Sequence, residues 1–178
     1  LRRSRGLGDV YKRQLLEHPA DASNLVISEI NYNPREATLL EKLNAAPLDL
    51  ENKDLFEFIE LTNTGATSIN LADLSFTEGI SLSLSPYPVA PGERALIVRD
   101  RDAFLERYGQ GLASLIAGTF VGGLDNDGEN LTLLDSAGSL ISSFSFNDSG
   151  SWPARPDGDG SSLELRDLTS DLFNPDNW

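Results

Sequence analysis

The chain has 178 residues, no cysteine and a formal net charge of −14, from 14 basic and 28 acidic side chains. A surface this acidic repels nucleic-acid backbones and anionic membranes, which leaves cationic partners, divalent metals and neutral polymers such as glycans. Without cysteine there is no disulfide and no thiolate chemistry. No apolar run reaches the roughly 18 residues that a membrane span requires. A chain of this length fits one domain with a substantial core.

The first residues differ in composition from the rest. Leu1–Gln14 holds five of the 14 basic residues and has no strand or helix periodicity. It resembles the adapter-derived translations found at the ends of environmental reading frames, so we interpret it as non-native; a genuine basic arm that contacts nucleic acid is the alternative. Residues 15–23 are predicted to be a linker, and the domain is predicted to span 24–178. No signal peptide is recognisable, so an export signal is expected outside this sequence.

The predicted domain begins with a strand and an inserted helix. Asn24–Asn33 reads as the first strand and ends at an Asn-Pro pair. On a regular strand Glu29 shares a face with Leu25 and Ile27, so it needs either an open end of that face or a polar partner. Residues 36–43 carry leucines at helical spacing, which predicts a short helix between the first two strands.

The stretch Leu55–Leu74 is expected to form the centre of the fold. Its first half, Leu55–Thr62, is rich in aromatic and β-branched residues, as expected for a core strand. Residues 63–65 supply turn chemistry, and Ser68–Leu71 follows at hairpin distance. The pattern therefore predicts strand, tight turn, strand.

Short strands with turn signals between them continue to the end of the chain. Arg94–Arg99 is a continuous apolar strand, and Asp100 can cap a helix from Arg101 to Tyr108 that Gly109 closes. The other predicted strands are 74–76, 80–84, 119–121, 129–134, 139–146 and 161–165. This pattern predicts an all-β, immunoglobulin-like sandwich with one or two short inserted helices, and argues against a βαβ architecture.

Several of these segments together resemble the lamin tail domain. The matching segments are Phe58–Asn63, Ile69–Leu71, Ala90–Glu93, Val26–Pro34, Gly128–Asp135, Trp152-Pro153, Ser162–Leu165 and Asn174–Trp178. The family is an immunoglobulin-like sandwich found at the end of nuclear lamins. Its bacterial form, the closer match, occurs in secreted or surface-attached modular proteins. The resemblance implies a fold and a binding or tethering role, and it supplies no catalytic motif.

The residue inventory argues against nucleophilic catalysis and against zinc. His18 is the only histidine, and it lies in the predicted linker, so neither a Ser-His-Asp triad nor a histidine-based zinc site can be built. Glu57 and Glu60 are the obvious carboxylate pair, yet three residues apart on one strand they point to opposite faces and cannot flank one bond. We interpret one as solvated and the other as hydrogen-bonded at the sheet edge. No catalytic residue is predicted.

Calcium is the metal that the sequence leaves open. Asp125, Asp127 and Glu129 form one cluster of oxygen ligands, and Asp157 and Asp159 form another. Calcium takes about six to eight oxygens from such loops. Neither cluster matches the full EF-hand pattern, and acidic residues before glycine are also ordinary turn sequences. Each loop is therefore either a turn or a calcium site, and no other cofactor is predicted.

The aromatic residues also have two interpretations. Trp152 and Trp178, with Tyr32 and Tyr87, form either a platform for a sugar or peptide or part of the core. The core is the favoured interpretation, with Trp178 fixing the C-terminus.

The resemblance implies a non-catalytic interaction or tethering module of a secreted or cell-surface modular protein, and the acidic composition with one histidine and no cysteine permits this role. Its partner is an unidentified protein or glycan, beside other domains of a larger parent chain. No nucleic-acid binding and no membrane insertion are expected. The alternatives are a Ca²⁺-dependent adhesion or glycan-binding module and an appended fragment of a carboxylate-based hydrolase.

Overall fold

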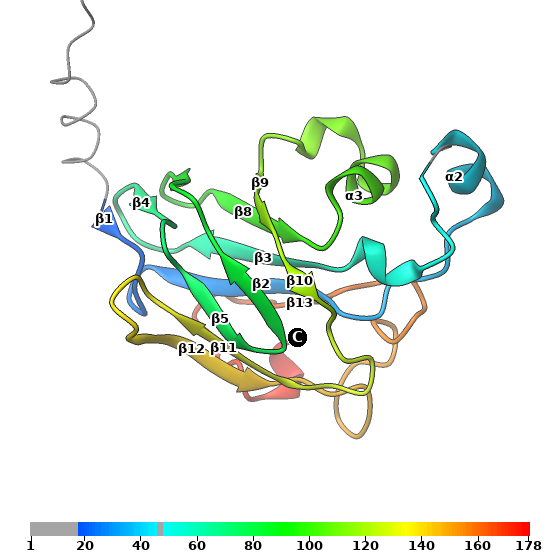
Figure 1. Cartoon of the computed structure of the whole chain (residues 1–178). Helices are drawn as coiled ribbons and strands as arrows, with labels where there is room; N and C mark the ends of the chain where they lie inside the picture. Colours follow the sequence, from blue (N-terminus) through cyan, green and yellow to red (C-terminus); the bar gives the residue numbers. More distant parts are fainter. Residues whose placement is uncertain (1–17, 46–47) are drawn as a thin grey trace, which may run out of the picture.

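The computed structural model describes residues 18–45 and 48–178, which form two five-stranded sheets and one small three-stranded sheet (Figure 1). In order across the first sheet the strands are β13 (Leu163–Glu164), β2 (Leu25–Asn31), β3 (Phe58–Asn63), β8 (Arg94–Val98) and β9 (Ile116–Thr119). The second sheet contains β10 (Val121–Gly122), β6 (Ile80–Ser83), β5 (Ser75–Glu78), β11 (Asn130–Leu134) and β12 (Leu140–Ser145). The third contains β1 (His18–Pro19), β4 (Ile69–Asn70) and β7 (Pro88–Val89).

The main core lies between the two larger sheets. Ile59 and Leu61 of β3 are fully buried in the same apolar cluster as Leu131 and Leu133 of β11 and Phe144 of β12. Apolar residues two positions apart on β3 and on β11 enter this cluster because successive side chains on a strand point to opposite faces. The predicted all-β, immunoglobulin-like sandwich is confirmed, and its two inserted helices are present.

Helix α3 (Arg101–Tyr108) covers part of the outer face of the first sheet, the face turned away from the second sheet (Figure 1). Its start is fixed by Asp100, whose Oδ1 accepts a hydrogen bond from the N–H of Ala103 at 2.8 Å. Its end is Gly109, which has a φ of 102°. Phe104 of α3 packs in one buried cluster with Phe58 of β3 and Val98 of β8. The helix predicted from the sequence is confirmed at both ends.

Helix α2 (Leu39–Asn44) forms where a helix was predicted, but for another reason. None of its residues is buried, and Leu39, Leu40 and Leu43 are 74%, 66% and 67% exposed. Leucines at helical spacing therefore do not mark a buried face here. The remaining helices are single 3₁₀ turns, η1 (Lys53–Phe56), η2 (Gln110–Leu112) and η3 (Pro175–Asn177). Among the described residues, no helix has the length and apolar character needed to cross a membrane.

The predicted central hairpin is wrong. Strand β3 pairs with β2 on one side and β8 on the other, whereas β4 pairs with β1 and β7 in the third sheet. The turn after β3 exists, but it carries the chain from one sheet to another. Asn63 holds this crossing, because its Nδ2 donates to the carbonyls of Thr67 and Val89 at 2.9 Å each. A two-residue strand such as β4 takes its partners from distant segments, which turn chemistry does not reveal.

A β-bulge decides which way Glu29 points. The pairing register between β2 and β3 shifts between Ile27 and Glu29. The extra residue turns Glu29 away from the face of Ile27, so that it lies opposite Glu60 on the outer face. There the Ser162 hydroxyl donates a hydrogen bond to its carboxylate. Glu29 therefore has the polar partner that the sequence required.

The segment just before the domain predicted at 24–178 contacts the sandwich. Residues 18–23, predicted as linker, include β1, and Ala20 is only 2% exposed in the main core. The N–H of His18 donates to the carbonyl of Ser68 at 3.0 Å, which joins this segment to the sandwich. The predicted non-native segment 1–14 and linker residues 15–17 lie outside the described residues.

The C-terminal residue is part of the core. The Trp178 ring is 4% exposed and stacks on Phe144, with ring centroids 5.3 Å apart and planes at 15°. Its Nε1 donates to the carbonyl of Leu172 at 3.0 Å. The core interpretation of Trp178 is therefore confirmed.

Trp178→Ala is expected to lower the free energy of unfolding by about 3–5 kcal/mol, the usual cost of emptying a buried aromatic site. Phe173→Ala is the matched control, because Phe173 lies in the same C-terminal segment and is 67% exposed. It is expected to change stability by no more than about 0.5 kcal/mol. Urea unfolding measures both variants, and equal losses would contradict the proposed role of Trp178.

Candidate functional site

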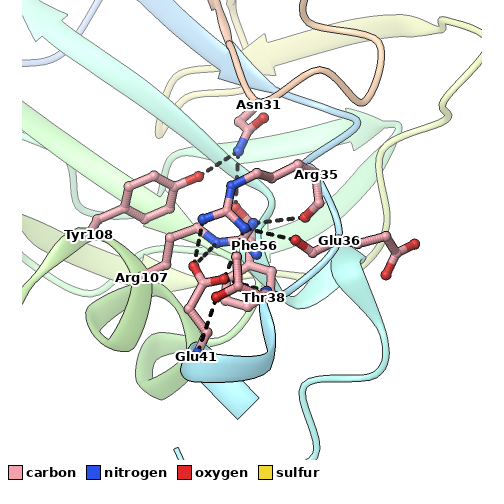
Figure 2. Close-up of polar contacts among 8 residues, drawn as sticks. All are labelled: Asn31, Arg35, Glu36, Thr38, Glu41, Phe56, Arg107 and Tyr108. Carbon is pink, nitrogen blue, oxygen red and sulfur yellow. Dashed lines mark hydrogen bonds and ion pairs between the residues drawn. The ribbon is translucent and has the colours of Figure 1, made fainter. Parts of the chain in front are cut away.

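A carboxylate on α2 joins two arginines from different parts of the chain (Figure 2). Glu41 accepts hydrogen bonds from Arg35 Nη1 and Nη2 at 2.9 and 2.8 Å, and from Arg107 Nε at 3.0 Å. It also accepts from the N–H of Thr38 at 2.6 Å, while the Thr38 hydroxyl accepts from the N–H of Glu41 at 3.2 Å. This reciprocal capping box starts α2, and the same carboxylate ties the helix to α3.

The Glu41 carboxylate is held in its charged form. Burial by itself raises its pKa, but the hydrogen bonds from Arg35, Thr38 and Arg107 together hold the pKa of Glu41 well below its ordinary value. Charge-assisted hydrogen bonds of this kind are stronger than neutral ones. Glu41 is therefore a fixed anion between two cations, with Arg35 more exposed than Arg107.

Arg107 is the buried member of the pair and keeps one unused donor group. Its side chain is 5% exposed, and its guanidinium carbon lies 3.2 Å from the centre of the Phe56 ring. Nη1 donates to the carbonyl of Arg35 at 3.0 Å. Nη2 is buried and has no hydrogen-bond partner among the described residues. An unpaired buried donor is uncommon in folded proteins, so this atom needs an explanation.

Arg107 lies in the wall of a cavity of about 230 Å³. The cavity is lined by Asn31, Pro34, Arg35, Arg107, Tyr108 and Gly160. The Tyr108 hydroxyl accepts a hydrogen bond from Asn31 Nδ2 at 2.9 Å. Burial raises the pKa of Tyr108, although the nearby Arg107 opposes this rise, so the hydroxyl keeps its proton at neutral pH. The cavity wall therefore offers both guanidinium and hydroxyl donors.

The two glutamates beside the core strand make separate structural interactions. Glu57 is 1% exposed; its Oε1 accepts from Arg99 Nη1 at 3.1 Å and its Oε2 from the N–H of Leu124 at 3.0 Å. Glu60 accepts from the Ser28 hydroxyl at 2.7 Å and pairs with Arg94 at 3.4 Å. Neither glutamate is solvated, contrary to the interpretation from the sequence.

The first predicted calcium loop forms a hydrogen-bonded turn. Asp125 Oδ1 accepts from the N–H of Asp127 at 3.0 Å, and Glu129 Oε1 accepts from the N–H of Asp125 at 2.9 Å. Gly128 has a φ of 103°, and a Cβ there would lie 2.4 Å from the carbonyl oxygen of Phe146. Glycine is thus required at this turn. Oδ1 of Asn126 is buried in the loop without a hydrogen-bond donor among the described residues.

The second predicted calcium loop contacts the end of the first strand. Asp157 Oδ1 accepts from Asn33 Nδ2 at 2.6 Å, and the N–H of Asp159 donates to the carbonyl of Arg155 at 3.2 Å. Asp157 and Asp159 are otherwise exposed. Across residues 18–45 and 48–178, no three His, Cys, Asp or Glu side chains converge as a metal site would require. The calcium interpretation of both loops stays a prediction.

The other aromatic candidates are largely engaged in packing. Tyr32 is fully buried, and its ring centre lies 4.9 Å from that of Phe146. Trp152 is half-buried, with its ring 6.4 Å from the Trp178 ring. Tyr87 is half-buried and its hydroxyl donates to the carbonyl of Ser114 at 2.5 Å. These side chains do not form one exposed stacking platform.

Comparison with known families decides what kind of domain carries this site. A sequence model described as the Lamin Tail Domain matches residues 18–148, well over half of the chain. The chain belongs to the lamin tail domain family. Searches of curated proteins and of solved structures found no match.

This lamin tail domain continues in space beyond the matched segment. Strand β13 pairs with β2 at the edge of the first sheet, and Trp178 completes the core. Gly160, which lines the cavity, also follows the matched segment. Residues after 148 are therefore part of both the fold and the candidate site.

Sequence reasoning missed the arginine cluster. One signal was present, because Thr38 and Glu41 have the spacing of a capping box. Nothing in the sequence pairs Arg35 with Arg107, which are far apart in the chain and meet only because α2 lies against α3.

Glu41→Ala is expected to lower the free energy of unfolding by about 2–4 kcal/mol, because it removes the capping box and leaves the buried Arg107 without its carboxylate. Glu51→Ala is the matched control. Glu51 lies outside α2 but forms an ion pair at 2.6 Å with Lys42 of that helix, and the Glu51 side chain is 74% exposed. The control should cost at most about 1 kcal/mol. Urea unfolding compares the two variants. A loss of stability for Glu51→Ala as large as that for Glu41→Ala would contradict the proposed role of Glu41 in joining Arg35, Arg107 and α2.

The buried Glu57 predicts a pH-dependent stability. Burial raises its pKa from 4.5 to about 7, although the Leu124 N–H and Arg99 oppose the rise. Between these pH values the folded form retains a proton that the unfolded chain has lost, so this group reduces stability as pH rises. We expect Glu57→Gln to remove this part of the slope between pH 4.5 and 7. Urea unfolding of the unsubstituted protein and of Glu57→Gln across this pH range tests the expectation. Parallel plots of unfolding free energy against pH for the two proteins would contradict it.

Proposed function

We propose that this lamin tail domain is a non-catalytic interaction module that tethers a secreted or cell-surface modular protein to a partner. The observation that carries the proposal is the composition of the cavity wall. Arg107 brings a buried donor without a partner, and none of the six described lining residues carries a carboxylate. Hydrolysis of a glycosidic bond canonically requires a pair of carboxylates, which these lining residues do not supply. Their donor groups are instead suited to binding a ligand.

The buried glutamates support binding over turnover. Glu57 has a pKa near the range of a general acid or base, which by itself is typical of active sites. Both of its oxygens, however, accept hydrogen bonds from the protein, and the side chain is 1% exposed. Glu41 is likewise held by two arginines. These carboxylates join structural elements and are not presented to a ligand.

The placement outside the cell rests on the resemblance of the motifs to the bacterial, secreted form of the family. A net charge of −14 is compatible with this placement, because strong like charge keeps a protein soluble. In this proposal other domains of a longer parent chain carry any enzymatic activity, and the lamin tail domain holds them at their place of action.

The test offers the full chain to a panel of immobilised glycans and extracellular proteins, in EDTA and in millimolar CaCl₂. Biolayer interferometry measures binding, and mass spectrometry measures the integrity of each ligand. We expect saturable, reversible binding to at least one member, equal in both buffers, with the ligand intact. Cleavage that is lost in Glu57→Gln would support the hydrolase alternative. Binding that requires calcium and is lost in Asp127→Ala would support the adhesion alternative.

A further inference from the structure

The unused donor of Arg107 has a defined surrounding. The side chain is fixed by the Phe56 ring below it, by Glu41 at Nε and by the Arg35 carbonyl at Nη1. These contacts leave Nη2 as the remaining hydrogen-bonding group of a 5% exposed guanidinium in the wall of the cavity. A rigid donor of this kind is preorganised for an acceptor that enters from outside.

A second donor is provided by Tyr108. Its oxygen accepts from Asn31 Nδ2, and no described residue accepts its proton. Asn31 is itself 4% exposed and also donates to the Phe56 carbonyl, so a buried and fixed side chain positions the Tyr108 hydroxyl. Figure 2 shows the side chains of Asn31, Arg35, Arg107 and Tyr108 converging from β2, the segment before α2, and α3.

The local charge favours an anion. Arg35 and Arg107 bring two positive charges and Glu41 neutralises one of them, so these three side chains carry a net positive charge on a strongly acidic chain. Glu29 is the further acidic group whose charge acts on Tyr108, and its carboxylate is already bonded by the Ser162 hydroxyl. Arginine presents paired N–H groups that match the geometry of a carboxylate. The bond between Arg35 and Glu41 already shows this mode of recognition inside the protein.

We propose that this cavity binds a carboxylate of a partner polypeptide, with Arg107 Nη2 and the Tyr108 hydroxyl as donors. The inference rests on the proposed function, because it names the ligand chemistry of an interaction module. The carboxylate belongs to an acidic side chain of that polypeptide.

The size of the cavity and the total charge favour one carboxylate over a polyanion. The cavity volume of about 230 Å³ is below the roughly 300–1,000 Å³ of pockets that hold drug-sized ligands, so the cavity suits one side chain better than several units of a polymer. The net charge of −14 repels acidic polysaccharides and nucleic acids, whose every unit is charged. A single acid in an otherwise neutral segment avoids most of that repulsion.

The aromatic and apolar surroundings favour a polypeptide over a sugar. Tyr108 is the aromatic residue of the described lining, and its ring packs against Phe58 and Phe104, with centroids 5.6 and 4.7 Å away. Its faces are thus partly used inside the protein. Helix α2, whose Glu41 bonds both Arg35 and Arg107, presents exposed Leu39 and Leu43, and exposed leucines suit apolar side chains of a peptide.

The experiment titrates the ¹⁵N-labelled full chain with two blocked peptides, Ac-Ala-Leu-Glu-Leu-Ala-NH₂ and the same peptide with Gln in place of Glu. NMR follows the Arg107 side-chain N–H signals and the backbone signals of α3. We expect the Glu peptide to bind at least about tenfold more tightly than the Gln peptide, as a charge-assisted hydrogen bond predicts. Equal affinities, or no binding of the Glu peptide, would overturn the proposal.

Two conservative variants test whether the peptide binds in the cavity or elsewhere on the surface. Tyr108→Phe removes one donor and keeps the ring, so affinity for the Glu peptide should fall several-fold. Tyr87→Phe makes the same change where the hydroxyl donates to Ser114 and should leave affinity unchanged. Melting curves confirm that both variants are folded. Equal effects of the two substitutions would overturn the assignment to this cavity.

Two further ligands test the source of the anion. The two ligands are glucuronate and inorganic phosphate. Tighter binding of either one than of the Glu peptide, at a site from which the peptide displaces it, would overturn the polypeptide assignment. Failure of the peptide while the full chain still binds a member of the glycan and protein panel would reject this inference and leave the interaction module standing. Ligand cleavage on the panel would reject the module itself.

Discussion

Strand β3 is buried along its whole length, and much of the structure follows from the need to satisfy both of its faces. One face carries Ile59 and Leu61 into the core between the sheets. The other carries Glu60 and Thr62, which cannot be left unpaired because buried polar groups require hydrogen bonds. The Ser28 hydroxyl lies 2.7 Å from both of these side chains, so β2 supplies the missing partner. A strand with one exposed face would need none of this network.

The same outer face positions the candidate site. Phe58 of β3 packs edge-on against the rings of Phe104 and Tyr108, and this contact fixes the last turn of α3. Arg107 is next to Tyr108 in that turn, so the sheet determines where its guanidinium lies. Glu41 then draws α2 to the same place. Arg107 and Tyr108 are thus on a helix that is packed on a sheet, and sites on such elements are positioned more precisely than sites on loops.

The acidic residues of this lamin tail domain have two physical roles. Glu41, Glu57 and Glu60 are internal ties that each bond an arginine and a backbone or hydroxyl donor. Asp125 and others in the loops accept N–H groups of their own turns. The carboxylates thus stabilise the fold, while the donors of Arg107 and Tyr108 lie at the cavity. This distribution is consistent with an interaction module.

The sequence by itself determined the class of fold, the family and the elements whose signals are local. Helix α3 was predictable because Asp100 and Gly109 mark its ends, and most strands because apolar runs stop at turn residues. Only the tertiary structure decided which strands pair, since β4 follows β3 in the chain yet belongs to another sheet. It also decided the face of Glu29, through a bulge, and the meeting of Arg35 with Arg107. Such features depend on contacts between segments far apart in the chain, and residue spacing does not encode them.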